Sequence, residues 1–294
     1  RTTETETMKN GRQYSLRWAL VHGLLFVLAL YFLVPLYVMV VASFKSLDEI
    51  LHSSIVALPI VWTTAGWEKA WSSACTGLMC TGIRPYFFET MAILFPAMSA
   101  AIVIGALNGY LMSFWRSKSA DILFGALIIG SFIPLQLFLI PLAVTMQKLG
   151  IFGSTLGLIL IHTVYGVPLT TMLYRNFYVT LPTELVKAAI VDGAGVFKIF
   201  RSVIVPMSAP ITIVAVILVF GGIYNDYIFA LTFGETGKRP IMAAVLNIIS
   251  TQYAVAEHNV NMAAVMISAL PTLLIFLVAG KFFVMGLAQG SVKG

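Results

Sequence analysis

The stretch LPTELVKAAIVDGAGVFKIFRSVIVPMSAP, residues 181–210, lies between two long apolar parts of the sequence and decides the fold class. Thr183 is predicted to be the N-cap of a helix with Glu184 in its first turn, where the helix dipole favours an anion. Gly193 stands where a left-handed C-cap needs a residue without a Cβ atom. A second helix is expected after this glycine and is expected to end at Pro206. Two short amphipathic helices around a glycine turn form a docking surface rather than a membrane span.

Each of the two predicted helices has an apolar face set by three- and four-residue spacing. The residues expected to share one face of the first helix are Leu185, Ala188, Ala189 and Asp192. The residues expected to share one face of the second are Val196, Phe197, Phe200, Val203 and Ile204, with Lys198 and Arg201 off that face.

The same stretch resembles the cytoplasmic EAA loop of ABC-importer permeases. The matching positions are the paired alanines Ala188 and Ala189, the turn Asp192, Gly193 and Ala194, the aromatic Phe200, and the prolines Pro206 and Pro210. Lys187 stands where the family usually has a glutamate, which reverses one charge on the docking helix. The resemblance implies that a separate ATPase subunit contacts this loop. The implied coupling residues are Glu184, Lys187, Ala188, Ala189, Asp192, Gly193, Ala194, Phe200 and Pro206.

The composition is that of a membrane protein. Apolar residues make up 59% and charged residues 10% of the 294 residues, against roughly 45–50% and about 25% in soluble domains. A helical span needs about 20 mostly apolar residues, and open strand edges are excluded from lipid. Six segments qualify: 18–44, 87–115, 122–144, 155–174, 211–231 and 263–280. The sequence therefore predicts an all-α polytopic membrane protein with six transmembrane helices and a cytoplasmic coupling-helix loop.

The net charge of +6 follows the predicted topology rather than a nucleic-acid surface. With both termini inside, twelve of the 18 Lys and Arg residues fall on the cytoplasmic side of the predicted spans. This distribution fits the positive-inside rule and places residues 181–210 in the cytoplasm. The predicted location is a prokaryotic cytoplasmic (inner) membrane.

The predicted domain organisation is a six-helix permease domain over residues 18–283, flanked by cytoplasmic tails at 1–17 and 284–294. The first tail is polar and is expected to be mobile. The first apolar run is too long for a signal-peptide core and has no small-residue cleavage site directly after it, so it is expected to be a span.

The outer segment before the second span contains the only two cysteines, Cys75 and Cys80. A local disulfide is favoured over two free thiols, since the outer compartment permits disulfides. No histidine or further cysteine lies at metal-ligand spacing. Short helices are predicted at 66–73 in this segment and at 242–250 in the second outer loop.

Polar residues inside the predicted spans are the candidates for a solute pathway. The cluster of Tyr224, Asn225, Asp226 and Tyr227 is the strongest, because an acid in a span should face a cavity or a partner. Its alternative is a structural hydrogen-bond network at a subunit interface. Glu89 is interpreted as an interfacial carboxylate, with a pathway role as the alternative. His162 is interpreted as a packing residue rather than a proton carrier.

Close helix packing is predicted on one face of the second span. Its small residues Gly105, Ala106 and Gly109, with Tyr110, allow another helix to approach. Asn108 beside them is available for a hydrogen bond to a neighbouring helix.

The end of the sequence carries a second resemblance. Gly286-Leu287 followed by Gly290-Ser291-Val292-Lys293-Gly294 is similar to the tail of carbohydrate permeases, with Ser291 in place of alanine. By resemblance, the partners are a second homologous permease, two ATP-binding subunits, an extracytoplasmic solute-binding protein and a sugar, in a lipid membrane and without nucleic acid. A hexose or small glucoside is the expected solute.

The sequence contains no phosphate-binding loop of the form G-x-x-x-x-G-K-[ST] and no catalytic or metal constellation. No cofactor is therefore expected on this chain, and ATP with Mg²⁺ is expected on the partner ATPase. The chain is expected to be a translocation subunit, not an enzyme. The alternatives are an ion-coupled secondary transporter, an ABC permease for a non-sugar solute and a membrane enzyme. The first would need coupling-ion groups and inverted repeats, and the last a convergent catalytic set.

Overall fold

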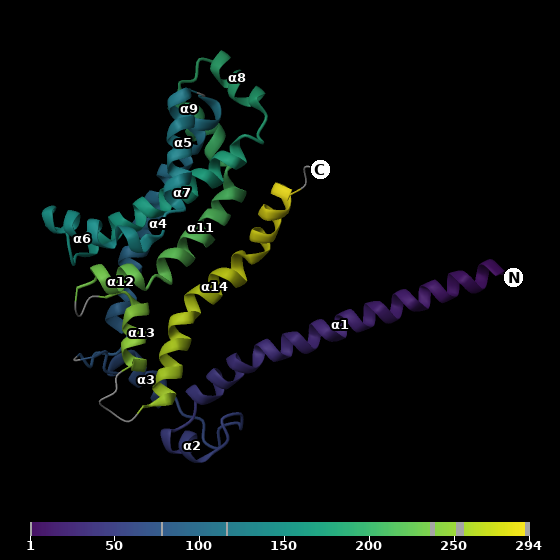
Figure 1. Ribbon diagram of the computed structural model, residues 1–294, viewed down its shortest axis with the longest axis vertical. Helices are drawn as coiled ribbons and strands as arrows, with labels where there is room; N and C mark the ends of the chain where they lie inside the picture. The colour runs from purple at the N-terminus through teal and green to yellow at the C-terminus, as the bar shows by residue number, and fades with distance from the viewer. Residues whose placement is uncertain (1, 78, 116, 236–238, 251–255, 292–294) are drawn as a thin grey trace. The chain divides into compact units, whose positions relative to one another are not determined.

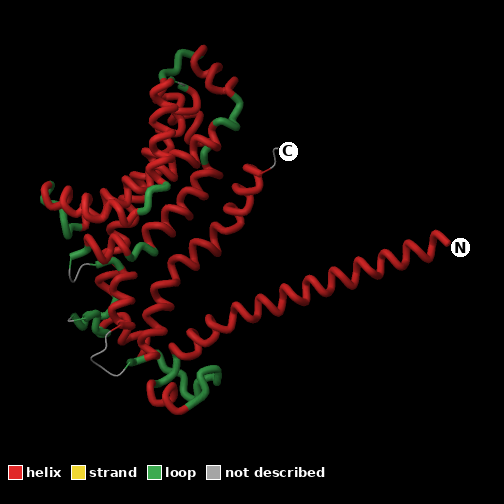
Figure 2. Tube along the Cα trace, in the orientation of Figure 1, coloured by secondary structure: helices red, strands yellow, loops and turns green. Residues whose placement is uncertain are grey.

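The computed structural model describes residues 2–77, 79–115, 117–235, 239–250 and 256–291, with the backbone alone for 2–17, 250 and 281–291. Within these residues every regular element is a helix (Figure 2). The predicted all-α class is confirmed.

Long helices carry most of the described chain (Figure 1). They are α1 (Thr2–Ser43), α4 (Arg84–Phe114), α7 (Thr155–Tyr178), α11 (Ala209–Tyr224) and α14 (His258–Ser291). The shorter elements before α11 are α2 (Leu47–His52), α3 (Ala65–Ser72), α5 (Lys118–Ser131), the 3₁₀ turn η1 (Leu135–Phe138), α6 (Leu139–Lys148), α8 (Thr183–Val191), α9 (Val196–Ile199), the π-helical turn η2 (Phe200–Ile204) and α10 (Val205–Met207). Those after it are α12 (Ile228–Phe233) and α13 (Ile241–Ser250). The helices predicted at 66–73 and 242–250 correspond to α3 and α13.

Among the described residues, four helices are long and apolar enough to cross a membrane: Trp18–Ser43, Arg84–Phe114, Thr155–Tyr178 and His258–Gly280. The count rises to six if each of two bent helix pairs forms one span. One such pair replaces the continuous helix predicted at 122–144, because the chain turns by 100° between α5 and the η1–α6 segment. Pro134 lies at this break, where it has no N–H to donate and disfavours helix in the residue before it. With 14 residues, α5 is about 21 Å long, shorter than the ~30 Å hydrocarbon core.

The second bent pair joins the 181–210 loop to the fifth predicted span. The helical run from Val196 to Met207 meets α11 at an angle of 79°. Pro206 does not end this run as predicted; it lies in the first turn of α10, a position that tolerates a missing N–H. The bend falls one residue after Met207, at Ser208.

Helix continues into both predicted tails in the described part. Residues 2–17 continue α1, and α14 extends through the start of the predicted C-terminal tail to Ser291. The assignment of these segments as cytoplasmic tails stays a prediction. Residues 292–294 lie outside the described residues.

The chain forms two compact units, residues 1–70 with 255–266 and residues 71–254 with 267–294. In the first unit α3 packs on the start of α14: a Cβ atom at Gly66 would lie 3.2 Å from the Asn259 carbonyl oxygen. Lys69 and Glu257 form an ion pair of 2.6 Å between α3 and the residue that precedes α14.

The second unit is built on the close approach of α4 and α7, which lie side by side in Figure 1. A Cβ atom at Gly105 would lie 2.1 Å from Thr170 Oγ1, and one at Gly109 would lie 2.7 Å from the backbone nitrogen of Arg175. Thr170 Oγ1 donates to the Ala101 carbonyl at 2.8 Å across the same contact. The predicted small-residue packing face is confirmed.

Candidate functional site

The loop between α7 and α11 begins with α8, whose start differs from the prediction. The N-cap is Pro182 rather than Thr183, because the Pro182 carbonyl accepts the Leu185 N–H and the chain enters the helix one residue earlier. The Thr183 hydroxyl donates to Glu184 Oε1 at 3.3 Å. The pKa of the Glu184 carboxyl lies below its usual value. The causes, largest first, are a hydrogen bond from the backbone N–H of Glu184 itself, the bond from the Thr183 hydroxyl, and the charge of the nearby Lys187. Glu184 is therefore ionised at neutral pH.

Gly193 ends α8 in the left-handed conformation that the sequence predicts. Its φ is +74°, its N–H donates to the Ile190 carbonyl at 2.9 Å and the Ala194 N–H donates to the Ala189 carbonyl at 2.9 Å. These two bonds are the pair that defines a Schellman C-cap. The glycine therefore fixes the direction in which the chain leaves α8.

The second loop helix buries a different set of side chains from the predicted one. Phe200 and Ile204 are buried as expected, but Ile199 is buried as well, and Phe197 is 67% exposed. The π-helical turn η2 follows these residues at Phe200–Ile204 and has more residues per turn than an α-helix, so the loop helix departs from the predicted α-helical period.

Three buried tyrosines of the two packed helices hydrogen-bond to this loop and to the start of α11. Tyr110 of α4 donates its hydroxyl to the Val196 carbonyl at 2.9 Å. Tyr178 and Tyr174 of α7 share hydrogen bonds with Ser208 Oγ at 2.9 Å and Thr212 Oγ1 at 2.8 Å. We call these three residues the tyrosine cluster. The apolar residues buried with it are Ala106, Val186, Ile199, Phe200, Ile204 and Ala215.

Sequence reasoning missed the tyrosine cluster as part of the site. Its signal was the four-residue spacing of Tyr174 and Tyr178, which puts both rings on one face of α7. Tyr110 gave no local signal, because its partner Val196 is 86 residues away.

Other apolar side chains of the loop are exposed. Val191 is 86% exposed and Ile190 is 52% exposed on α8, and Phe197 on α9 is 67% exposed. We call these three residues the apolar loop patch. Large exposed apolar side chains are typical of interaction surfaces when they lie together. Figure 1 shows α8 beyond the ends of α4 and α7, where a partner could reach it.

The other predicted coupling residues fall into two sets. Ala189 and Ala194 are half-buried and pack against the tyrosine cluster. Lys187, Ala188, Asp192 and Pro206 are exposed. Lys187 also borders a pocket of about 600 Å³ between α8 and the ends of α4 and α7, together with Ser113, Phe114, Tyr178 and Ile190.

At the other end of α4 and α7, the structure brings Asp226 to the start of α12. Its two carboxylate oxygens accept the N–H groups of Phe229 at 3.3 Å and Ala230 at 3.0 Å. His162 Nε2 lies 3.8 Å from Asp226 Oδ2, and its ring meets Phe229 edge-on at 5.4 Å. These contacts give Asp226 a helix-capping function within the chain.

The neighbours of Asp226 take separate positions. Tyr224 ends α11 with its side chain 1% exposed, and its hydroxyl has no hydrogen-bond partner among the described residues. Asn225 donates its side-chain amide to the Gly221 carbonyl at 3.0 Å. Tyr227 is half-buried and its carbonyl accepts the Leu231 N–H at 2.9 Å. A pathway role for these residues stays a prediction.

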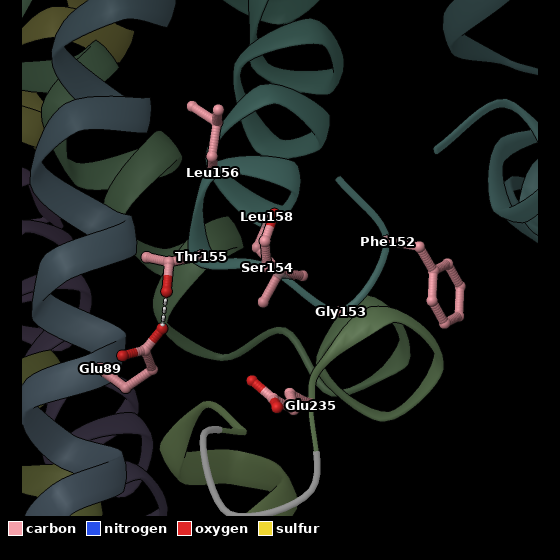
Figure 3. A pocket seen from close by; sticks show the side chains of 8 residues that line it. All are labelled: Glu89, Phe152, Gly153, Ser154, Thr155, Leu156, Leu158 and Glu235. Carbon is pink, nitrogen blue, oxygen red and sulfur yellow. Dashed lines mark hydrogen bonds between the residues drawn. The ribbon is translucent and has the colours of Figure 1, made fainter. Parts of the chain in front are cut away.

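Glu89 borders a pocket of about 530 Å³ at this same end. Figure 3 shows it with Thr155, whose hydroxyl donates to its carboxylate, and with Glu235 on another element. Phe152, Gly153, Ser154, Leu156 and Leu158 complete the lining. Glu89 is half-buried and hydrogen-bonded, and its interpretation as an interfacial carboxylate or a pathway residue stays a prediction.

The cysteine pair lies in the loop before α4. The structure joins Cys75 and Cys80 in a disulfide. Between them, the Thr76 N–H donates to the Met79 carbonyl at 2.7 Å, so the disulfide closes a short turn.

Comparison with known proteins agrees with this architecture. The family model for the binding-protein-dependent transport system inner membrane component matches residues 101–287, which include the whole loop. The sequence is 41% identical over 181 residues to the probable ABC transporter permease protein PH1216 of Pyrococcus horikoshii, covering 61% of this chain and 65% of that protein. It is 31% identical over 262 residues to the melibiose/raffinose/stachyose import permease protein MelC of Bacillus subtilis, covering 89% of this chain and 91% of MelC.

The fold also matches a solved structure. A chain of a bacterial ABC transporter involved in the import of the acidic polysaccharide alginate aligns with a TM-score of 0.79 and 16% identity, over 92% of this chain and 97% of that one. The chain therefore belongs to the binding-protein-dependent transport system inner membrane components, the family of ABC-importer permeases.

Proposed function

We propose that this chain is one of two transmembrane subunits of an ATP-driven sugar importer and that its 181–210 loop receives the motion of a partner ATPase. The observation that carries the proposal is that this loop is bound within the chain and still exposes large apolar side chains. Tyr110 of α4 and Tyr178 of α7 bind the loop, and Tyr174 of α7 binds the start of α11, which follows it. The loop also exposes the apolar loop patch.

This construction suits a transmitting element. A partner that binds the apolar loop patch and moves would carry α8 with it, because the Schellman cap fixes α8 to the next part of the chain. The Tyr110 and Tyr178 hydroxyl bonds would pass the displacement to the packed helices, and the Tyr174 bond joins α7 to α11. Alternating access by rigid-body movement of helices needs a connection of this kind.

The proposed assembly contains a second homologous permease, two ATP-binding subunits and an extracytoplasmic solute-binding protein. ATP and Mg²⁺ would be bound and hydrolysed on the ATP-binding subunits, with no cofactor on this chain. Both termini and the 181–210 loop would face the cytoplasm of a prokaryotic cell, in agreement with the positive-inside distribution of Lys and Arg.

The proposed solute is a sugar. Support comes from the carbohydrate-permease resemblance of the 286–294 tail and from the name of MelC, an import permease for melibiose, raffinose and stachyose. A hexose or small glucoside is the first candidate and an oligosaccharide the second. Uptake of labelled glucose, melibiose and raffinose by cells expressing the whole system would separate the two. Uptake of amino acids or metal ions alone would contradict the sugar assignment.

The coupling role is tested by a matched pair of glycines in the loop. Gly193 has φ +74° and Gly195 has φ −71°, and a Cβ atom at either position meets no atom within 4 Å. Alanine at the two positions therefore differs in backbone strain alone, about 1–2 kcal/mol for a left-handed residue. Gly193→Ala, and more strongly the β-branched Gly193→Val, should reorient α8 relative to α9.

The measurement is ATPase activity of the assembled complex with sugar-loaded binding protein, together with recovery of the ATPase in pull-down. We expect both to fall in the Gly193 variants and to stay at wild-type level in Gly195→Ala, with equal amounts of permease in the membrane. Wild-type activity and recovery in Gly193→Val would exclude this loop as the coupling site.

A further inference from the structure

Lys45 is a buried cation at the end of the first span. It lies two residues beyond α1 and is 1% exposed. Its ammonium donates to the Ser54 carbonyl at 2.9 Å and to Ser53 Oγ at 3.3 Å. Since an ammonium has three N–H donors, these two neutral acceptors leave one donor without a bond.

No carboxylate in the described part of the chain neutralises this charge. Lys45 belongs to none of the ion pairs seen there, such as His52 with Asp48, Lys69 with Glu257, and His162 with Asp226. A buried charge is unfavourable unless it is both paired and hydrogen-bonded, and neutral oxygens supply only the second condition. Lys45 is therefore a buried cation that lacks an anionic partner among the described residues, so an anion from outside the chain would stabilise it.

A pocket of about 280 Å³ adjoins Lys45 within the same compact unit. Its other lining residues are Val38 and Ala42 of α1, Ile50, Leu51 and Ile55 of the following segment, and His258 and Met262 of α14. The volume lies at the lower limit of small-ligand pockets, about 300 Å³. The walls are apolar apart from Lys45 and the exposed His258. A group that enters this pocket must combine a compact anion with an apolar continuation.

The length of the preceding apolar helix predicts that the pocket lies at the level of the membrane interface. The apolar part of α1 has 26 residues, about 39 Å at 1.5 Å per residue, which exceeds the ~30 Å hydrocarbon core. Lys45 follows directly after this part. Tyr37 and Trp62, both exposed aromatic residues, lie in the same unit, and such side chains gather at the headgroup level. Lipid phosphates occupy this level in either leaflet.

We propose that this pocket binds the phosphate of an anionic membrane lipid, with the Lys45 ammonium as its ligand. The phosphate accepts the remaining Lys45 donor and neutralises the buried charge, and His258 borders the phosphate at the open side. The apolar walls of α1 and α14 contact the carbons that follow the headgroup. A carboxylate of a docked protein partner fits the charge, but the apolar walls at the interface favour an amphiphile.

The test uses the full chain in its assembled complex, stripped of lipid in detergent and titrated in native mass spectrometry. The probes are phosphatidylglycerol and a phosphate-free glycolipid with the same acyl chains. We expect wild type to prefer phosphatidylglycerol by about tenfold or more, the effect of one hydrogen bond between charged groups. Lys45→Gln should abolish the preference, while Lys45→Arg retains it. Lys148→Gln, at an exposed lysine, is the matched control and should leave it unchanged.

A second variant separates loss of the site from loss of the fold. Ile55 borders the pocket, is 61% exposed and follows the residue whose carbonyl binds Lys45. Ile55→Glu places a carboxylate beside the ammonium. It should abolish the phosphatidylglycerol preference and raise the unfolding temperature of the lipid-free complex, whereas Lys45→Gln abolishes the preference without the carboxylate.

Three results would overturn the proposal. The first is an unchanged lipid preference in Lys45→Gln. The second is full replacement of phosphatidylglycerol by millimolar inorganic phosphate, which would identify a soluble-anion site. The third is tenfold weaker docking of the solute-binding protein in Lys45→Gln with unchanged lipid retention, which would assign the pocket to a partner's carboxylate. None of these results depends on the identity of the transported solute.

Discussion

The two ends of the α4–α7 pair use different chemistry to hold the segments attached to them. At the loop end, the neutral hydroxyls of the tyrosine cluster bond to a carbonyl and to two side-chain hydroxyls. At the opposite end, the carboxylates of Glu89 and Asp226 accept from a hydroxyl and from backbone N–H groups. The first end holds a loop with an exposed apolar patch, and the second holds polar pockets and a helix start.

This difference indicates which end can serve as a fixed attachment. Neutral hydrogen bonds inside an apolar cluster carry no net charge, and the low local dielectric strengthens them. Carboxylates near an apolar span require polar neighbours, and they mark places where a solute or a partner can compete for those neighbours. We therefore predict force transmission at the loop end and solute contact at the other end.

The largest effect is expected from closing the space between the helices near the loop end. In Gly109→Ala the new Cβ atom would lie 2.7 Å from the backbone nitrogen of Arg175 and 2.8 Å from Tyr174 Cβ. Overpacking against backbone costs about 1–3 kcal/mol. Gly222→Ala in α11 is the control, since a Cβ atom there meets nothing within 4 Å, and a helix gains about 0.5–1 kcal/mol from this change. Denaturant unfolding in detergent should show a lower free energy of unfolding for Gly109→Ala and a higher one for Gly222→Ala than for wild type. Equal stabilities of the two variants would contradict the packing argument.

A smaller loss is expected at the opposite end from Asp226→Leu. The variant leaves the Phe229 and Ala230 N–H groups without their acceptor and removes a cap, at a cost of about 0.5–2 kcal/mol. Asp226→Asn keeps an acceptor and should lose less. We expect reduced uptake or reduced recovery of the assembled complex for the leucine variant. Normal uptake by a normally assembled complex would show that this carboxylate has neither a pathway nor a structural function.

The smallest effect directly contrasts one tyrosine from each end. Tyr110→Phe removes the bond to the Val196 carbonyl and should destabilise the chain by about 1 kcal/mol. Tyr224→Phe removes a buried hydroxyl that has no partner among the described residues, so stability should stay the same or rise. Thermal unfolding of both variants checks the contrast. If Tyr224→Phe lowers uptake without lowering stability, the hydroxyl serves the solute, and the pathway prediction gains direct support.

Features set by local chemistry could be predicted from the sequence. The conformation of Gly193 follows from a helix end that needs a residue without a Cβ atom. The close approach at Gly105 and Gly109 follows from small residues spaced along one helix face. The family resemblance came from the same local stretch, since the loop residues keep fixed spacing.

Features set by distant or irregular geometry could not be predicted. The apolar face of the second loop helix was derived from an α-helical period, and η2 changes that period. The break near Pro134 interrupts a run whose composition alone indicates one span. The tyrosine cluster depends on partners 30 to 86 residues away, and burial of Lys45 depends on a loop that folds back over it. Apart from the four-residue spacing of Tyr174 and Tyr178, no periodicity in the sequence indicates these contacts.

The neutral attachment of the loop has a consequence for ionic strength. Salt screens charges over about 8 Å at 0.15 M and about 3 Å at 1 M, and it acts weakly on hydroxyl bonds within an apolar cluster. Concentrated salt should therefore leave the loop bound to its own helices, while it weakens any contact that the exposed Lys187, Lys198 and Arg201 make with an acidic surface. A salt titration therefore distinguishes two contacts of the loop. The hydroxyl bonds to its own helices should persist, and a charged contact with an acidic surface should weaken.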